Sequence, residues 1–387
     1  MSSLPPHGGT LRPLLAAADE RAALLDRART LRQVRLTSRE TSDLIMLASG
    51  AFSPLGGFMT RRDYDRVVAE MRLADGTLWP VPITCAVAAA EAGGITLGSE
   101  VALVDGESDE LMAVLRVEEK YPYDKKREAR HVFRTEDEKH PGVAKLYAQP
   151  EVLLGGPVRV LSEGPYPAQY GEAYARPAET RALFAAKGWT TVAAFQTRNP
   201  IHRSHEYCTK IALEICDGVL IHPLVGKLKA DDIPADVRMK CYETLLDHYY
   251  PKDRVVLKVY PMEMRYGGPR EAVLHAVFRQ NYGCSHIIIG RDHAGVGSYY
   301  GPFDAQKIFE EIPAGALAIK TLNIDWTFWC FKCGGMASTK TCPHPPADRL
   351  MISGTKLREM LAAGQMPPVE FSRPEVLRIL MDYYKSL

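Results

Sequence analysis

The sequence has little that would suit a membrane protein. Its longest stretch without a charged side chain is 17 residues, Leu44 to Thr60, and three glycines and one proline interrupt it. A membrane-spanning helix needs about 20 consecutive, mostly apolar residues, so we predict no transmembrane segment and no membrane partner. The apolar run at residues 14–18 is too short for the core of a signal peptide and leads directly into acidic residues.

An excess of charge of either sign is also missing. The chain has 387 residues, with 48 Lys and Arg against 47 Asp and Glu, so its formal net charge is +1. This balance provides no basic field that could hold a polyanion, and we predict no nucleic-acid partner. With 46% hydrophobic residues the chain can bury the cores of two or three domains. Its partner is predicted to be a small molecule.

Cysteine is scarce, but it is unevenly distributed. Eight cysteines in so long a chain are too few for a disulfide framework, which favours a reducing compartment, the cytoplasm. Three of them, Cys330, Cys333 and Cys342, precede His344 closely, and together the four side chains complete a tetrahedral Zn²⁺ ligand set. We predict a structural zinc there. The alternative, reduced cysteines of a core, is disfavoured by the surrounding lysines and prolines.

Two patterns divide the chain. Up to about residue 160, short β-like runs such as 81–87, 101–104 and 111–117 alternate with Gly, Pro and charge clusters, which predicts a β-rich half. Residues 155–177 are rich in Gly, Pro and Tyr without a helical period, and we interpret them as a connection between domains. The predicted domains are residues 1–168, 169–327 and 328–387, the last containing the zinc site and a small helical tail.

The central part alternates apolar runs with amphipathic helical segments. The predicted strands are 191–196, 219–226, 254–261, 286–290 and 316–322, and the predicted helices are 203–216, 235–249, 269–282 and 304–312. Continuous apolar runs are typical of buried parallel strands, and their alternation with helices predicts a doubly wound α/β sheet. Ligands bind beyond the carboxyl ends of such strands, so chemistry is expected just after Gln196 and Ile289.

The first of these strand ends continues as QTRNPIHRSHE. Asn199 suits an N-cap and Pro200 a first helical residue, so we predict that a helix begins here. His202 and His205 then share one face at the helix start, where backbone N–H groups favour an anion, and Arg198 adds charge. The sequence therefore predicts a phosphate site. A metal site is a weaker interpretation because no third ligand is near, and the position at a strand end argues against two incidental surface histidines.

The second strand end continues as GRDHAGVG, residues 290–297. Its three glycines allow the backbone to approach a ligand, and Arg291 adds a planar fork of donors. Loops of this composition are often plain turns. Two basic loops at two strand ends of one sheet, however, are what a nucleotide and a second anion would require.

These motifs resemble those of the ATP sulfurylase (sulfate adenylyltransferase) family, in its form without a fused APS kinase domain. QTRNPIHRSHE departs from the family pattern only at Ser204, where Ala is common, and GRDHAG matches a second signature. AFSPLGGFM, WPVPIT, MRYGGPREA and FSRPEV are also similar, so the resemblance extends over nearly the whole chain. It implies an N-terminal PUA-like β-rich domain, a central Rossmann-like nucleotidyltransferase domain and a small C-terminal domain.

The resemblance implies transfer of AMP from MgATP to sulfate, giving adenylyl sulfate and pyrophosphate, or the reverse. Sulfate is already a dianion, so the site needs neutralising charge rather than a general base. Catalytic roles are implied for Thr197, Arg198, Asn199, His202, His205 and Arg291, and substrate contacts for Gln196, Arg198, Gly290, Arg291, Asp292, His293 and Ala294. Of these, Gln196, Arg198 and the Ala294 N–H are expected to hold sulfate. Mg²⁺ is expected to arrive with ATP.

Two other functions share some of these features. An adenylyltransferase for another acceptor, such as a nucleotide or pantetheine phosphate, would share the two histidines at a helix start, but QTRN and GRDHAG argue against it. A PUA-like domain with a zinc knuckle could also be an RNA-binding module, against which the near-zero net charge and the lack of an aromatic RNP-type signature argue. We expect a homodimer.

Overall fold

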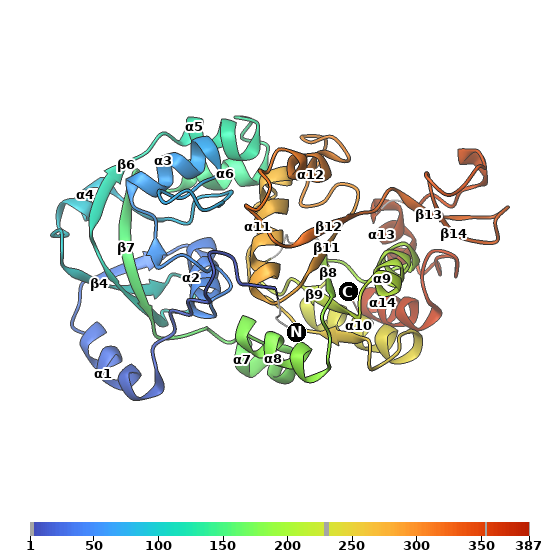
Figure 1. Cartoon of the computed structure of the whole chain (residues 1–387), viewed down its shortest axis with the longest axis horizontal. Coiled ribbons are helices and arrows are strands. Elements are labelled where there is room, and N and C mark those ends of the chain that lie inside the picture. Colours follow the sequence, from blue (N-terminus) through green and yellow to red (C-terminus); the bar gives the residue numbers. More distant parts are fainter. Residues whose placement is uncertain (1–3, 228–231, 353, 387) are drawn as a thin grey trace.

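In the computed structural model, which describes residues 4–227, 232–352 and 354–386, the chain forms two large sheets and a small C-terminal hairpin (Figure 1). The first sheet comprises β1 (Gln33–Leu36), β2 (Gly57–Phe58), β3 (Cys85–Val87), β4 (Glu100–Asp105), β5 (Leu111–Arg116), β6 (Glu119–Pro122) and β7 (Val152–Val160). Its longest strand, β7, pairs antiparallel with β2, β3, β5 and β6. No helix in the described part of the chain is long and apolar enough to span a membrane.

The N-terminal half contains the predicted strands but also helices that we did not predict. They are α1 (Ala18–Ala28), α2 (Ser38–Ala48), α3 (Arg61–Glu70), α4 (Ala89–Gly93), α5 (Lys125–Glu128), a π-helical turn (Ala129–Phe133) and α6 (Pro141–Ala148). The start of α2 has a clear local cause. The Thr37 hydroxyl accepts the Glu40 N–H, and the Glu40 carboxylate accepts the Thr37 N–H in return, which forms a capping box.

The predicted connection at 155–177 is wrong in its first residues. Residues 155–160 belong to β7, and only the part after Val160 links the two sheets. A Cβ atom on Gly156 would lie 2.1 Å from the Arg116 carbonyl oxygen, and one on Gly155 would lie 2.7 Å from that of Met59. These glycines permit close strand packing, so their presence here marks a crowded strand rather than a loop.

The second sheet confirms the parallel α/β prediction. Its strands are β8 (Val192–Thr197), β9 (Gly218–Pro223), β10 (Val255–Leu257), β11 (His286–Ile289) and β12 (Lys320–Asn323), all parallel, in the order β10-β9-β8-β11-β12. The helices of this part are α7 (Tyr166–Tyr170), α8 (Pro177–Ala186), α9 (Arg203–Ile215), α10 (Ala235–Tyr249), α11 (Gly268–Asn281) and α12 (Asp304–Lys307), with short 3₁₀ turns at Gly171–Ala173 and Ile308–Glu310.

Alternating side chains of the central strands enter two different cores. Ala194 and Ile287 pack in the core that includes α11, whereas Ala193 and Ile288 pack in the core that includes α9 and α10. Helices therefore cover both faces. The chain order runs outward from β8 to β10 on one side and from β11 to β12 on the other, so the topological switch point lies between β8 and β11.

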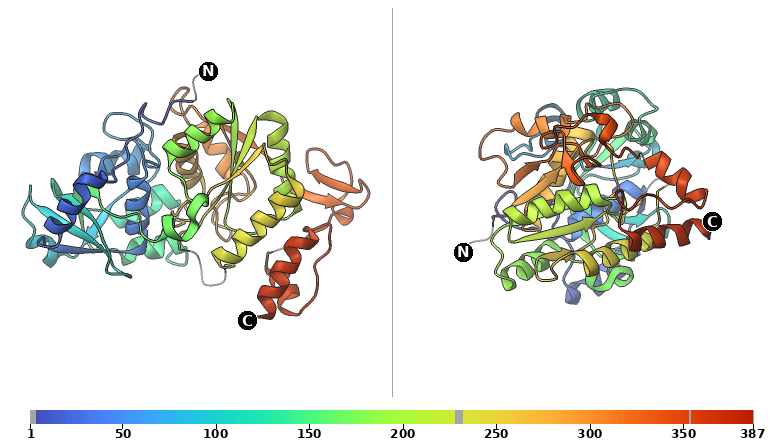
Figure 2. Two further views of the ribbon diagram at one scale, coloured as in Figure 1. Left: turned by 90° about the horizontal axis from the view of Figure 1, so that it is seen from below. Right: turned by 90° about the vertical axis from the view of Figure 1, so that its right-hand side faces the viewer.

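The C-terminal part begins after β12, where the polypeptide leaves the second sheet. β13 (Thr327–Cys330) and β14 (Gly335–Ser338) form an antiparallel hairpin, followed by a 3₁₀ turn (Pro346–Asp348), α13 (Gly354–Ala362) and α14 (Pro374–Lys385). Val376 and Leu380 of α14 are buried in the same core as Leu245 of α10. Figure 2 shows this part at the end of the molecule opposite the first sheet.

Candidate active site

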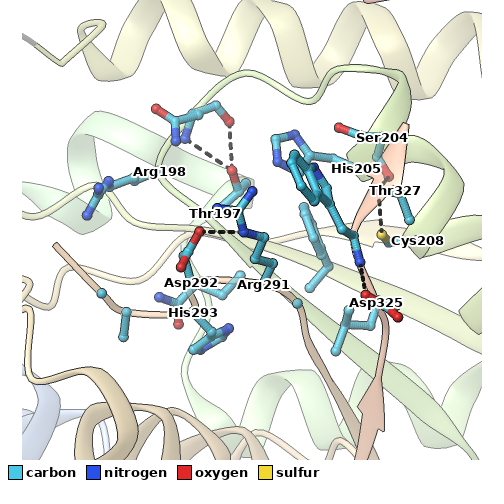
Figure 3. Close-up of a pocket in the computed structure, with 18 of the residues that line it drawn as sticks. Thr197, Arg198, Ser204, His205, Cys208, Arg291, Asp292, His293, Asp325 and Thr327 are labelled. Atoms are coloured by element: carbon cyan, nitrogen blue, oxygen red, sulfur yellow. Dashed lines mark hydrogen bonds and ion pairs between the residues drawn. The ribbon is translucent and has the colours of Figure 1, made fainter. Parts of the chain in front are cut away.

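A cavity of about 350 Å³ opens at the switch point, between the loops that follow β8 and β11. Its lining comes from four segments of the chain and from Met264. The segments contribute residues 195–199; Ser204, His205 and Cys208; Ile288 and residues 290–295; and residues 325–327. Figure 3 shows Arg291 paired with Asp292 at the centre of the site, with Arg198 of the other loop to their left. Every sequence-predicted substrate or catalytic residue except His202 lines this cavity.

The loop after β8 is held by its own threonine. The Thr197 hydroxyl donates to the Asn199 carbonyl oxygen (2.7 Å) and accepts from the Asn199 N–H (3.1 Å), while the Tyr242 hydroxyl also donates to that carbonyl (2.8 Å). These bonds fix the backbone of Asn199 in a turn. The cap predicted at Asn199 is therefore wrong, whereas the helix predicted from residue 203 is confirmed. α9 begins at Arg203, and His202 is its N-cap residue.

The two histidines consequently occupy different positions. His205 lines the cavity, and its Nδ1 accepts the His202 N–H at 3.4 Å. The His202 ring lies behind it, where its Nδ1 is 3.0 Å from the Ser372 hydroxyl and its face packs on Phe371 with ring centroids 4.6 Å apart. His202 is only 7% exposed. The structure therefore brings His205, but not the His202 ring, to the cavity wall.

Both imidazoles are neutral at pH 7. Burial lowers the pKa of His202 to about 3, with the neighbouring His205 adding to the effect. Burial likewise lowers the pKa of His205 to about 4, and a contact with the Pro200 carbonyl opposes this only in part. Because Nδ1 of His205 accepts a hydrogen bond, its ring proton resides on Nε2. His205 can therefore donate a hydrogen bond but supplies no full charge.

The positive charge of the cavity comes from two arginines. The Arg198 guanidinium lies over the Tyr266 ring (5.1 Å to the centroid), and that of Arg291 lies over Trp326 (4.2 Å). Arg291 also pairs with Asp292 (Nε to Oδ2, 3.0 Å). Stacking on the rings leaves the N–H edges available to an anion.

The loop after β11 adopts an uncommon backbone conformation. Asp292 and Ala294 both have φ of 55°, in the left-handed region that side chains rarely adopt. The Asp292 N–H donates to the Pro302 carbonyl (2.8 Å), and the Ala294 carbonyl accepts the Gly268 N–H (3.0 Å). None of the hydrogen bonds in the described part of the chain uses the Ala294 N–H. That donor is available to a ligand.

The Gln196 side chain also has polar atoms that lack a good hydrogen-bond partner. Its Oε1 is buried without a hydrogen-bond partner among the described residues, and its Nε2 has only the Met264 sulfur at 3.8 Å. Buried amides are normally satisfied, so an unpaired amide in a cavity wall indicates a ligand contact.

Sequence reasoning missed the wall formed by Asp325, Trp326 and Thr327. Asp325 Oδ1 accepts the Trp326 N–H (2.6 Å), which fixes the turn beneath the indole that Arg291 covers. This segment follows β12, which pairs with β11, so its carboxyl end reaches the same edge of the sheet. The strand-end rule applied to a third strand could have found it.

A second cluster lies just beyond this wall, in the β13–β14 hairpin and the segment that follows β14. The possible ligand atoms of Cys330, Cys333, Cys342 and His344 all lie within 4.8 Å of one another. The Cys333 and Cys342 sulfurs are 3.7 Å apart, and His344 Nδ1 is 3.2 to 3.7 Å from the three sulfurs. Zn–S bonds of about 2.3 Å in a tetrahedron require sulfurs about 3.8 Å apart, so the geometry fits zinc.

Known proteins resemble this chain over its whole length. A profile of PUA-like domains matches residues 4–163, and a profile of the ATP-sulfurylase family matches residues 171–383. The sulfate adenylyltransferase of Chlorobaculum tepidum is 58% identical, with 100% of this chain and 96% of that protein aligned. That of Desulforamulus reducens is 53% identical over 100% of both chains. A solved structure titled a hexameric APS kinase, from Thiobacillus denitrificans, gives a TM-score of 0.76 at 26% identity, covering 98% of this chain and 69% of that one.

Proposed function

The chain belongs to the ATP-sulfurylase family and is a sulfate adenylyltransferase, and from this premise we propose how its cavity performs the reaction. AMP passes from ATP to sulfate, giving adenylyl sulfate and pyrophosphate, or in the reverse direction. The observation that carries the proposal is that two arginines, a neutral histidine donor and two unused amide groups line one cavity at the switch point.

Sulfate is proposed to bind between Gln196, Arg198 and the Ala294 N–H. The guanidinium neutralises the dianion, while the Gln196 amide and the free backbone N–H satisfy its oxygens. A dianion attacks phosphorus without losing a proton. The cavity accordingly needs no general base, and its carboxylates are otherwise engaged: Asp292 with Arg291, and Asp325 with the Trp326 N–H.

The nucleotide is proposed to lie along Gly290 to His293, with its phosphates toward α9. Arg291 neutralises phosphate charge, and Thr197 and Asn199 fix the turn that separates the two anions. His205 donates its Nε2–H to the oxygens on which charge develops as pyrophosphate leaves. His202 acts on this step through His205, because its N–H holds Nδ1 of that ring.

Mg²⁺ is proposed to enter with ATP. Among the described residues, the Cys330 cluster is the one group of three or more close His, Cys, Asp or Glu ligands, so the cavity offers no carboxylate cage of its own. Mg²⁺ commonly binds through substrate phosphates, whose charge it would offset. A structural Zn²⁺ is proposed at Cys330, Cys333, Cys342 and His344, where its ligands would fasten the hairpin that carries Thr327.

The assembly and location remain proposals as well. Residues 1–168, 169–327 and 328–387 are proposed as the three domains, and the protein as a cytoplasmic homodimer. None of the described cysteines is in a disulfide bond, which suits a reducing compartment. Phe331 and Met351, 56% and 52% exposed, offer apolar surface for association. Light scattering would test the dimer.

The activity is tested directly with purified protein, MgATP, sulfate and inorganic pyrophosphatase. The expected product is adenylyl sulfate, with phosphate release that depends on sulfate. A nucleotide, pantetheine phosphate or RNA in place of sulfate should not support release. Equal release without sulfate, or release with one of these other acceptors only, would show that the cavity serves another reaction.

A further inference from the structure

Below the loop after β11, three side chains form a chain of contacts that the mechanism above does not use. Nε2 of His293, which lines the cavity, is 3.0 Å from Nδ1 of His275. Nε2 of His275 is 3.6 Å from Oε1 of Glu271, one helical turn earlier on α11. Glu271 and His275 are completely buried. This series of side-chain contacts therefore leads from the cavity wall into the centre of the molecule.

Glu271, at the inner end of this series of contacts, is held by several hydrogen bonds. The Glu271 carboxylate accepts the N–H groups of Arg265 (2.8 Å) and Gly267 (2.9 Å). The Arg265 guanidinium donates to the buried Asp43 carboxylate (2.6 Å), which belongs to α2 in the N-terminal half. Two segments 222 residues apart in sequence thus fix the position of Glu271.

The protons in the chain have one consistent arrangement. Burial lowers the pKa of His275 to about 4, and Glu271 opposes the shift only in part. Burial raises the pKa of Glu271, but hydrogen bonds from His275 and from the Arg265 N–H, with the Arg265 charge, outweigh it, so the pKa is lowered. At pH 7 a carboxylate thus faces a neutral imidazole. His275 Nε2 faces the Glu271 carboxylate at 3.6 Å, so the His275 proton is placed on that nitrogen, toward the negative charge. Nδ1 then accepts, and His293 must carry its proton on Nε2.

The loop that His293 belongs to needs such support. Asp292 and Ala294, on either side of His293, both have the left-handed φ of 55°. Side chains persist in this conformation only where the surrounding structure holds them. Besides the Ala294 carbonyl, which accepts the Gly268 N–H, the His293 ring connects this loop to α11 through the completely buried His275.

We propose that Glu271 and His275 are positioning residues that hold His293, and with it the left-handed turn at residues 292–294, in the conformation that binds nucleotide and sulfate. The inference rests on the proposed role of this loop in substrate binding. Neither residue touches substrate. Their loss lowers the fraction of molecules whose loop can bind, and apparent affinity falls by the same factor.

The test compares three variants with the wild-type protein. His275→Phe keeps a buried ring but removes the hydrogen bond to His293 and the polar contact with Glu271. It should raise KM for ATP and for sulfate by about 10- to 100-fold while kcat falls less. His275→Asn places an amide oxygen near the position of Nδ1 and should recover part of the lost affinity. His7→Phe is the matched control, because His7 is a buried histidine whose Nε2 lies 2.6 Å from the Leu78 carbonyl oxygen and whose backbone N–H bonds Asn281 at the other end of α11. Its KM values should stay within about twofold of the wild type.

A second readout does not depend on activity. In ¹⁵N spectra of the imidazoles at pH 7, His293 of the wild type should be neutral with its proton on Nε2, and this preference should weaken in His275→Phe. Wild-type-like KM values in a folded His275→Phe protein, or an Nδ1–H tautomer for His293, would overturn the inference. Should His275→Phe not fold, the His275→Asn kinetics and the wild-type spectrum decide. A wild-type protein inactive with sulfate would instead refute the proposed function.

Discussion

At the level of single residues, one set of side chains gives the cavity its positive charge and another set provides neutral hydrogen-bonding groups. Burial lowers the pKa values of His202 and His205 to about 3 and 4, so these rings are neutral donors and acceptors. Positive charge comes from the guanidinium groups of Arg198 and Arg291. The arginines can therefore hold anions in the ground state, whereas the fixed Nε2–H of His205 can favour the transition state.

His205→Ala should accordingly lower kcat far more than it changes KM for ATP. Removing one preorganised donor to a developing anion typically costs about 100- to 1000-fold in turnover. Steady-state kinetics with saturating sulfate measure both constants. A near-normal kcat with a raised KM would mean that His205 binds ATP rather than stabilising the departing phosphates.

Arg198→Ala provides the contrasting case. Its guanidinium pairs with sulfate before and during the reaction, so the variant should lose sulfate affinity as well as rate. KM for sulfate should rise by roughly tenfold or more, because a charge-assisted contact is worth about 1.5–3 kcal/mol. Varying sulfate at saturating ATP measures the effect. An unchanged KM for sulfate would place the dianion elsewhere in the cavity.

At the scale of elements, the sequence was informative wherever a local pattern decided the structure. The helix predicted at 235–249 is α10, and the one predicted at 269–282 is α11 displaced by one residue. The helix predicted at 203–216 is α9, but the cap predicted at Asn199 was wrong because two signals competed. Asn199 and Pro200 resemble a helix cap, but the Thr197 hydroxyl bonds both backbone groups of Asn199 and delays the helix to Arg203.

The hairpin of the C-terminal part should depend on its metal. Cys342→Ser removes one of four ligands, so bound zinc should fall from one per chain to well below one, and Tm should drop by several degrees because metal affinity contributes folding free energy. Elemental analysis and thermal unfolding measure both. Cys241→Ser, which alters a buried cysteine of α10, is the matched control and should keep its zinc. Wild-type protein purified without chelator yet free of zinc would contradict the assignment.

At the scale of the whole molecule, the two sheets are joined by buried polar contacts that no sequence pattern reveals. Arg265 and Asp43 form an ion pair in which both side chains are less than 5% exposed. The connection between His293 and Glu271 likewise depends on segments that only the complete fold brings together. Strand ends and motifs predicted where the cavity lies. The buried contacts that hold its loops join residues far apart in sequence, so only the folded structure reveals them.

Buried neutral histidines should make the protein sensitive to acid. For His205 and His275 the folded pKa, about 4, lies below the unfolded value of 6.5, so the unfolded state binds more protons as the pH falls. Their stability contribution is complete above pH 6.5 and is lost progressively towards pH 4. Tm should fall by roughly 5 °C or more between pH 7 and pH 5.

Variants separate these histidines from other acid effects. His275→Gln removes one titrating group, so its Tm should fall less between pH 7 and pH 5 than that of the wild type. His248→Gln changes an exposed histidine and should leave the slope unaltered. A wild-type Tm that is constant over this range would mean that the buried histidines are not neutral in the folded protein.

The central claim is that sulfate attacks without a general base, helped by two arginines and a neutral histidine. The most direct measurement is kcat for adenylyl sulfate formation at saturating MgATP and sulfate, from pH 7 to pH 9. His205, with a pKa of about 4, keeps one protonation state throughout, and the arginines stay charged. We predict a kcat that varies less than about twofold over this range. A profile that rises or falls tenfold with an apparent pKa between 7 and 9 would show that a titrating acid or base takes part, and would contradict it.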